Sequence, residues 1–338
     1  MSTDANASPV RFVFVGAGGI AKTHANAAKG IEGVEIVGAA DPSAEALTEF
    51  TSLTGAKGFS DTGAMLDAIA SGELHADALF LCTPPAVRRD VIEPALSAGL
   101  SVLMEKPIAR TAEEGRAIVD LADEHAQRAV GIGYCHRFTP AVLEMRSIVA
   151  SGRIGRLTRF ENVFAFHHPP MGERWFSDPA VSGGGSFIDT GCHSLDLFQF
   201  LVGVPKTVGA VTDHDWPGRG ESSATVLVRA AEGEHAGVAG VILAGWLEPA
   251  RFQVRLVGTG GMLFYDYEHP EDLVLTGPDG ATETIRVETH EVRFARQLEA
   301  FAAAVRDGRS ASESGLASAA DGLAVARAVD MVGDVVRL

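Results

Sequence analysis

A strand, a glycine-rich turn, a helix and a second strand follow one another at the start of this chain, and this order restricts the fold most strongly. The apolar run at 11–15 ends in Gly16-Ala17-Gly18-Gly19, a helical stretch extends to about residue 29, and a second apolar run at 34–40 leads into Asp41. Apolar runs of this length are typical of parallel strands covered on both faces. The pattern predicts a βαβ unit with a right-handed crossover.

The alternation of strands and helices continues to about residue 104. Helices are predicted at 44–54, 62–71 and 88–98, and strands at 78–82 and 101–104. Pro94 lies inside the last of these helices, which it is expected to kink or shorten. The alternation predicts an α/β fold with a doubly wound parallel sheet, which we place in a first domain at 9–133.

From about residue 157 the pattern changes to extended runs with few helices between them. The predicted strands lie at 157–166, 206–212, 223–230, 238–246, 252–257 and 262–265, and the predicted helices at 187–201, 290–306 and 314–332. Such a pattern predicts an α+β domain with a large, mostly antiparallel open sheet at 134–338. The two closing helices are candidates for packing back on the first domain.

Composition narrows the class of protein. Of the 338 residues, 44 are acidic and 28 basic, and the resulting net charge of -16 opposes binding to nucleic acid and anionic membranes. No run approaches the roughly 18 apolar residues that span a bilayer, and the N-terminal MSTDANASPV lacks the basic and apolar parts of an export signal. Three cysteines without a C-x-x-C pair fit a reducing compartment. We expect a cytoplasmic protein with a small-molecule partner.

The glycine-rich turn is a candidate dinucleotide site. Gly16, Gly18 and Ala21 fit the fingerprint in which glycines let the backbone approach a pyrophosphate, and Gly19 and Ile20 open the helix whose N-terminus stabilises it. Asp41, 20 residues beyond Ala21, would accept the ribose hydroxyls and repel a 2′-phosphate, so NAD is preferred to NADP. The alternative is a glycine-rich turn that binds nothing.

Two further loops emerge at the carboxyl edge of the predicted sheet, where a nicotinamide binds. Thr83 and Pro84 follow one strand, and Glu105 and Lys106 follow the next. A partly desolvated lysine there can polarise a carbonyl or bind a substrate hydroxyl. A surface lysine paired with Glu105 is the alternative.

In the second domain, three glycines precede a helix that carries Asp189 and His193. Four residues of separation place both side chains on one helix face, so the carboxylate can orient and charge-stabilise the imidazole during proton exchange. A helix N-terminal aspartate and a satisfied buried histidine would give the same spacing.

Together these motifs resemble the glucose-fructose oxidoreductase, inositol dehydrogenase and MocA (Gfo/Idh/MocA) family. They are Gly-Ala-Gly-Gly-Ile-Ala at 16–21, Glu105-Lys106-Pro107, Gly133-Tyr134-Cys135-His136-Arg137-Phe138-x-Pro140, and the segment from Gly183 through Asp189, Gly191 and His193 to Asp196. The resemblance implies that Lys106, Asp189 and His193 are catalytic. It further implies that the second domain binds substrate and forms a homodimer or homotetramer through its sheet. A histidine common in the family stands here as Arg88.

Other residues are candidates for substrate binding. His167 and His168 precede Arg174 and Trp175, so this segment could close over a polyol, with the indole stacked on a sugar face. Arg137 binds substrate or anchors the domain junction. Trp216 and Trp246 are placed in strands as core or interface residues, and no metal site is assigned because no third ligand stands at a metal spacing.

These motifs predict an NAD(P)-dependent oxidoreductase that acts on a CH–OH group of a sugar or of an inositol-like cyclic polyol. His193 takes the hydroxyl proton as hydride leaves the same carbon, Lys106 stabilises the oxyanion and Asp189 steadies the imidazolium. Two alternatives remain. One is an NAD-using glycosidase that works by transient oxidation and elimination, and the other is a sugar- and NAD-sensing protein without turnover, which the intact catalytic set disfavours.

Overall fold

The computed structural model describes residues 8–334. The predictions that concern the N-terminal export signal and the last four residues of the second domain lie outside this range. The described chain forms two compact units. The first unit comprises 8–105, 117–133 and 294–319, and the second comprises 106–116, 134–293 and 320–334. The sequence domains at 9–133 and 134–338 stay a proposal, because the units follow contacts rather than chain order.

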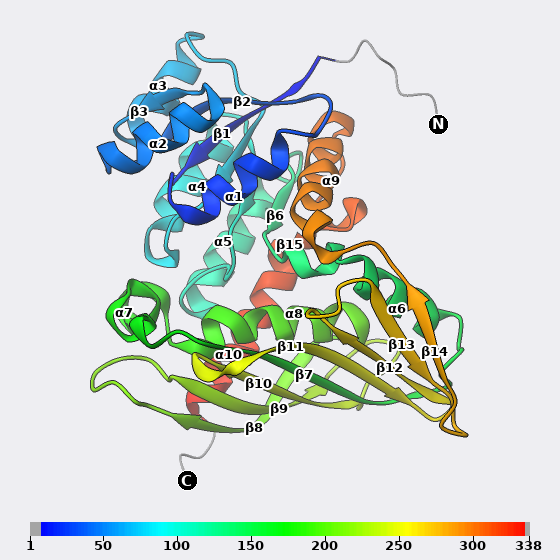
Figure 1. Ribbon diagram of the computed structural model, residues 1–338. Helices are drawn as coiled ribbons and strands as arrows, with labels where there is room; N and C mark the ends of the chain where they lie inside the picture. Colours follow the sequence, from blue (N-terminus) through cyan, green and yellow to red (C-terminus); the bar gives the residue numbers. More distant parts are fainter. Residues whose placement is uncertain (1–7, 335–338) are drawn as a thin grey trace. The chain divides into compact units, whose positions relative to one another are not determined.

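The first unit is built on a seven-stranded sheet (Figure 1). Its strands, in spatial order, are β15 (Ala317–Ser318), β6 (Val130–Ile132), β5 (Ser101–Met104), β4 (Ala78–Leu81), β1 (Val10–Val15), β2 (Val34–Ala40) and β3 (Lys57–Phe59). All neighbouring strands run parallel except the short β15, which is antiparallel to β6. The predicted doubly wound parallel sheet is confirmed, and its strand order reverses between β1 and β4.

Helices connect the strands of this sheet. They are α1 (Gly19–Ala28), α2 (Ala44–Thr54), α3 (Thr62–Ala70), η1 (Pro85–Val87), α4 (Arg88–Ser97), α5 (Ala112–Glu124, with 117–124 in this unit), α9 (Arg293–Asp307, from residue 294 onward) and η7 (Ser312–Ser314). Phe301 of α9 packs against Phe12 of β1 with ring centroids 5.7 Å apart, so the end of the chain completes the core around β1. Pro94 lies inside α4, which spans ten residues.

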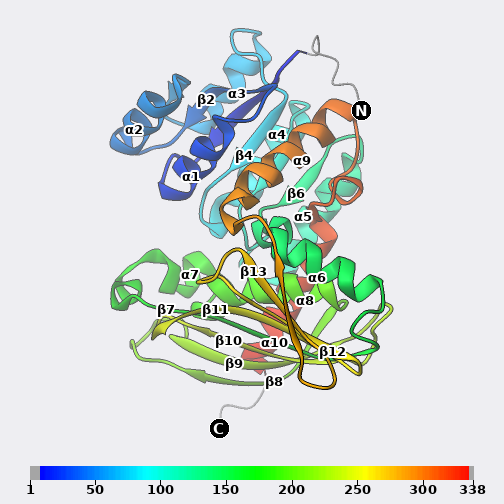
Figure 2. The same cartoon turned by 45° about the vertical axis from the view of Figure 1, so that its right-hand side comes forward.

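The second unit contains an eight-stranded sheet (Figure 2). Its strands, in spatial order, are β14 (Thr282–Arg286), β13 (Asp272–Thr276), β12 (Gly261–Asp266), β11 (Leu247–Gly258), β7 (Leu157–His167), β10 (Ala239–Gly245), β9 (Ser223–Ala230) and β8 (Pro205–Asp213). Only β7 and β10 pair in parallel, so the predicted mostly antiparallel sheet is confirmed.

Helices and turns of the second unit carry most of the predicted site residues. They are η2 (Cys135–Phe138), α6 (Pro140–Ala150), η3 (Pro169–Glu173), η4 (Trp175–Ser177), α7 (Pro179–Ser182), η5 (Phe187–Gly191), α8 (Cys192–Leu201), η6 (His290–Val292) and α10 (Ala319–Asp334, from residue 320 onward). Helix α8 packs on β7, β8 and β10 (Figure 2). Within residues 8–334 no helix is both long and apolar enough to cross a membrane.

The placement of two tryptophans in strands was wrong. Trp216 lies in the turn after β8, and Trp246 lies in the bend between β10 and β11. For Trp216 the reason is local, because Pro217 and Gly218 follow it and favour a turn over pairing in a sheet.

Candidate active site

The turn after β1 forms a cradle with open space above its backbone. Gly16 adopts φ +90°, and a Cβ there would stand 2.7 Å from the carbonyl oxygen of Cys82, so only glycine fits. Cβ atoms at Gly18 and Gly19 would meet nothing within 4 Å. Gly18 is the N-cap of α1, and neither a capping side chain nor an acidic residue occupies this helix end. The free N–H groups and the positive end of the helix dipole suit a pyrophosphate.

Asp41 lies beside this cradle, at the carboxyl end of β2. One carboxylate oxygen accepts the backbone N–H of Ala17 at 2.7 Å, and the other accepts that of Ser43 at 2.8 Å. Each oxygen keeps a second lone pair, so the carboxylate can still accept the two ribose hydroxyls of a nucleotide. The residues at this site therefore fit NAD. Ile20, also predicted to contact the cofactor, keeps 37% of its surface exposed in the first turn of α1.

Arg88 supports the neighbouring loop that carries Thr83 and Pro84. Its guanidinium, 1% exposed, donates from Nε at 3.2 Å and from Nη2 at 2.9 Å to the carbonyl oxygen of Thr83. The residue that departs from the family pattern therefore fixes the backbone of a predicted cofactor loop from within the core of the first unit.

Glu105 has a buried partner in the same unit. Its carboxylate lies 2.7 Å from Nε2 of His24, which is fully buried on α1 and packs edge-on against Phe80 with ring centroids 4.2 Å apart. This pair ties the end of β5 to α1. Glu105 stays a proposed cofactor contact, and its contact with His24 shows how the strand end next to Lys106 is held.

Lys106 and Asp189 form the centre of the candidate site in the second unit. The Nζ of Lys106 donates to the side chain of Asp189 at 2.7 Å and to its backbone carbonyl at 2.8 Å. Their side chains are 16% and 12% exposed, so the pair is largely but not completely removed from water. The ammonium of Lys106 is therefore bound by Asp189 within the second unit.

The backbone around Asp189 forms one turn of π-helix, called the π-turn below, rather than an α-helix. The segment η5 (Phe187–Gly191) is π-helical, and the α-helical geometry begins only at Cys192. A Cβ at Gly191 would stand 2.3 Å from the ring of Phe187, so glycine is needed for this aromatic ring to pack across the turn. The N–H of Phe187 donates to the side chain of Glu221 at 2.8 Å, which anchors the start of the turn. π-turns of this kind are frequent at functional sites.

The predicted pairing of Asp189 with His193 is wrong. Within residues 8–334 no hydrogen bond joins them, and the second carboxylate oxygen of Asp189 instead accepts the indole N–H of Trp246 at 3.3 Å. Both carboxylate oxygens of Asp189 are bound by residues distant in the chain, Lys106 and Trp246, which helix spacing alone does not reveal. Asp189 therefore orients Lys106, and His193 is positioned by other groups.

Two aromatic side chains pack against His193. The rings of Tyr134 and His136 stand nearly perpendicular to it, with centroids at 6.0 Å and 4.7 Å. Burial lowers the pKa of His193 well below 6.5, and the positive charge of Lys106 lowers it further. The imidazole is therefore neutral near pH 7 and able to take a proton. His136 belongs to a segment matching the family motif, but sequence analysis did not single it out.

Two indoles connect this centre to the segment at 167–175. The ring centroids of Trp216 and Trp246 lie 6.2 Å apart. A Cβ on Gly172 would stand 2.4 Å from the ring of Trp216, so η3 packs directly against this indole. The backbone N–H of His168 donates to the carbonyl of Trp246 at 2.8 Å. Trp175 is 37% exposed and stacks on the neighbouring Phe176. His167 and Arg174 are exposed as well.

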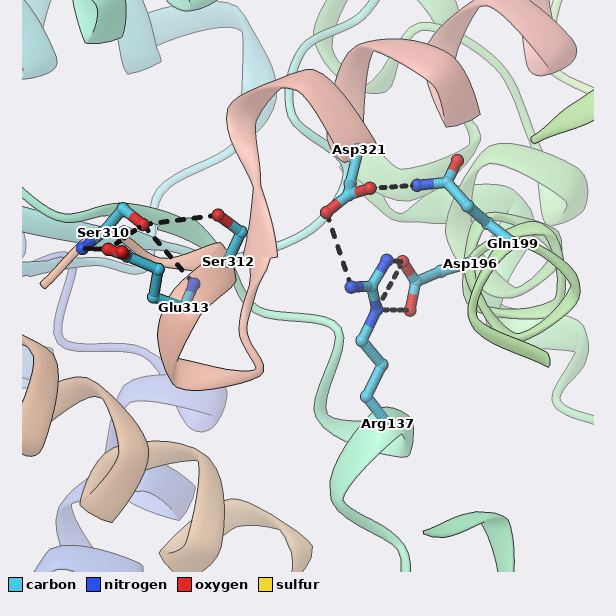
Figure 3. A network of polar contacts seen from close by, with 7 residues as sticks. All are labelled: Arg137, Asp196, Gln199, Ser310, Ser312, Glu313 and Asp321. Carbon is cyan, nitrogen blue, oxygen red and sulfur yellow. Dashed lines mark hydrogen bonds and ion pairs between the residues drawn. The ribbon is translucent and has the colours of Figure 1, made fainter. Parts of the chain in front are cut away.

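Arg137 forms ion pairs with two carboxylates (Figure 3). Its guanidinium binds Asp196 of α8 with contacts of 2.7–3.0 Å and reaches Asp321 of α10 at 3.4 Å. Burial raises the pKa of Asp196 to about 6, partly offset by the charge of Arg137. Gln199 donates to the other oxygen of Asp321. The structure favours anchoring over substrate binding for Arg137, here between η2, α8 and α10.

Within residues 8–334 no group of three or more His, Cys, Asp or Glu side chains is arranged to hold a metal ion. A doubly wound sheet with a nucleotide cradle, joined to a sheet domain that carries a buried lysine, a carboxylate and a neutral histidine, defines an NAD(P)-dependent oxidoreductase acting on CH–OH groups. Residues 10–134 match the model of an oxidoreductase family with an NAD-binding Rossmann fold, and 142–264 match the Gfo/Idh/MocA C-terminal domain. The chain belongs to the Gfo/Idh/MocA family.

Individual relatives span most of the chain. Inositol 2-dehydrogenase of Rhizobium meliloti (strain 1021) is 28% identical and covers 95% of each chain. The dTDP-3,4-didehydro-2,6-dideoxy-alpha-D-glucose 3-reductase of Streptomyces violaceoruber is 31% identical over 77% of this chain and 76% of its own. Among solved structures, levoglucosan dehydrogenase in complex with NADH and levoglucosan superposes with a TM-score of 0.85, at 21% identity and 97% coverage of both chains.

Proposed function

We propose that this protein transfers hydride between NAD and a carbinol carbon of a sugar, a sugar derivative or an inositol-like polyol, with Lys106, Asp189 and His193 as its catalytic residues. The observation that carries the proposal is the Lys106–Asp189 pair beside a histidine held neutral. A cation and a neutral base together are the groups that oxidation of an alcohol requires.

Each residue has a separate role. When bound, NAD supplies the acceptor for the hydride. The Nδ1 of His193 is buried without a partner among the described residues, so Nε2 is the nitrogen that takes the hydroxyl proton. Lys106 donates to the substrate oxygen and stabilises the negative charge that develops there. Asp189 holds the Lys106 ammonium in position, and this role replaces that of steadying the imidazolium.

The preference for NAD over NADP rests on Asp41. Its carboxylate is fixed by two backbone N–H groups at the end of β2, where a ribose 2′-phosphate would meet its negative charge. We expect Asp41→Ala to lose at least tenfold in NAD affinity, equal to about 1.4 kcal/mol, and to lose little or none in NADP affinity. Titration calorimetry with each cofactor measures this, and equal losses for both would remove Asp41 as the discriminating residue.

The substrate class rests on the relatives and on the segment at 167–175. Relatives named for inositol, levoglucosan and a deoxy-sugar nucleotide are all named for cyclitol or sugar rings. In our proposal Trp175 stacks on the ring, and His167 and Arg174 bind its other hydroxyls. Assembly into a homodimer or homotetramer through the β8–β14 sheet, and a cytoplasmic location, are further proposals from the family pattern.

The experiment combines a substrate panel with one variant. Purified protein is mixed with NAD and with inositols, aldoses, anhydrosugars and glycosides, and reduced nicotinamide is followed by absorbance. We expect turnover with at least one compound, and loss of about two to four orders of magnitude in His193→Ala with NAD binding retained. Near-normal turnover in a folded variant would remove His193 from the mechanism. An aglycone released without accumulated NADH would identify a glycosidase instead.

A further inference from the structure

His193 lacks the hydrogen bond that normally fixes a catalytic imidazole. Its Nδ1 is buried and has no partner among residues 8–334. A histidine that acts as a base is usually oriented by a group bound to its second nitrogen. Here Asp189, the obvious candidate, binds Lys106 and Trp246 instead. Another feature of the second unit must therefore hold the ring plane of His193.

The nearer of the two rings that pack on His193 belongs to His136. The two imidazoles meet edge to face, with an interplanar angle of 78° and centroids 4.7 Å apart, against 6.0 Å for Tyr134. Rotation of the His193 ring would break this contact, so the orientation of His136 sets that of His193.

His136 is itself held in place by contacts with side chains of the eight-stranded sheet and of the turn that follows β12. Its Nδ1 lies 2.7 Å from the hydroxyl of Tyr267, which follows β12. Its ring also contacts those of Phe164 at 4.9 Å and Tyr267 at 5.3 Å. Burial raises the pKa of Tyr267, so the phenol keeps its proton throughout the working range. A protonated phenol can donate to Nδ1, and this leaves the ring proton of a neutral His136 on Nε2.

Charge favours the same arrangement. Burial lowers the pKa of His136 well below 6.5, and the positive charges of Arg293 and Lys106 lower it further, with His290 acting in the same direction. A neutral His136 adds no positive charge beside His193, whose basicity such a charge would reduce.

We propose that His136 and Tyr267 form a positioning pair for His193, in which the Tyr267 hydroxyl fixes one tautomer and one orientation of His136 and His136 fixes the ring plane of His193. Neither residue touches the reacting atoms. The consequence for catalysis rests on the proposed function, but the arrangement of the three side chains does not.

The test uses imidazole nitrogen NMR, which detects tautomers without turnover. Protein labelled with ¹⁵N-histidine is compared at pH 7.5 in the wild type, in Tyr267→Phe and in the matched control Tyr265→Phe. Tyr265 is fully buried, and its hydroxyl bonds the carbonyl of Pro270 and lies 3.5 Å from Nδ1 of His290. The control therefore removes the hydroxyl of a neighbouring tyrosine that contacts neither His136 nor His193 through a hydrogen bond, and only the His290 resonances are expected to change. We expect one Nε2-protonated tautomer of His136 in the wild type and control. Tyr267→Phe should show mixed tautomers together with shifted His193 resonances.

Kinetics provide the second readout once a substrate is known. Tyr267→Phe should lower kcat about tenfold and leave the KM for NAD unchanged, because only the orientation of the base is affected. A proton on Nδ1 of His136 in the wild type overturns the proposal even if the variant does not fold. Unchanged His193 resonances in a folded Tyr267→Phe overturn it too. Absence of turnover with the expected NMR result would instead contradict the proposed function alone.

Discussion

Acidification is expected to destabilise the second unit through two histidines that remain neutral in the folded chain. Burial lowers the pKa of both His136 and His193 well below 6.5, whereas in the unfolded chain they bind protons near pH 6.5. The unfolded state therefore binds more protons as the pH falls below 6.5, so the stability from these groups is complete above that pH and is lost below it.

The magnitude follows from the same linkage. Between pH 7.5 and 5.5 each histidine costs about 1.4 kcal/mol of unfolding free energy, so the pair costs about 2.8 kcal/mol. Replacing His136 by Gln should remove about half of this loss. Asp196, whose pKa is raised to about 6, acts in the opposite direction, but it is present in both proteins and cancels in the comparison.

Urea unfolding followed by tryptophan fluorescence measures this loss. The three tryptophans, Trp175, Trp216 and Trp246, all belong to the second unit, so the signal comes from the unit that contains both histidines. The wild type and His136→Gln are compared at pH 7.5 and 5.5. An equal loss of stability in the two proteins would refute the reasoning, because it would mean that His136 is protonated in the folded state.

Three further predictions follow from the site. Asp196→Asn should destabilise the protein by about 3–5 kcal/mol, measured by urea unfolding, because it leaves the buried guanidinium of Arg137 without its main charge partner; a loss below 1 kcal/mol would contradict this. Gly191→Ala should lower the melting temperature, since its methyl group would overlap the ring of Phe187, and an unchanged temperature would show that the π-turn can relax. Gly18→Ala should leave stability within about 0.5 kcal/mol but weaken NAD binding at least tenfold in calorimetry, because its methyl group would meet only the space that the pyrophosphate needs; unchanged affinity would place the cofactor elsewhere.

Much of the fold could be predicted because the relevant patterns are local. The bounds of β2, α2 and β5 agree with the apolar runs and capping residues of the sequence. β14 was missed because this strand at the edge of the sheet has the polar sequence TETIR. β13 was missed as well, although its sequence DLVLT contains an apolar run. The short β3 and β6 have only three residues each, too few to show a period.

The residues proposed for the site could be named from the sequence, but their contacts could be predicted only in part. Lys106, Asp189 and His193 could be named from motifs, whereas the contact of Asp189 with Lys106 joins residues 83 positions apart. Tyr267 could not have been found, because its hydrogen bond to His136 joins residues 131 positions apart and no motif surrounds it. Trp246 was assigned to the core on its residue type, and its indole N–H nevertheless binds the carboxylate of Asp189.

The π-turn makes the spacing between Asp189 and His193 sensitive to insertion and deletion. A π-turn is an α-helix with one residue added, and removing that residue would rotate everything beyond it by about 100° relative to the preceding turn. Deleting Thr190, for example, would let η5 and α8 join as one regular helix. Such a chain could keep the contacts of α8 with the sheet or the position of Asp189, but not both. A single added residue in this helix therefore sets how Asp189 and His193, two of the proposed catalytic residues, are oriented relative to each other.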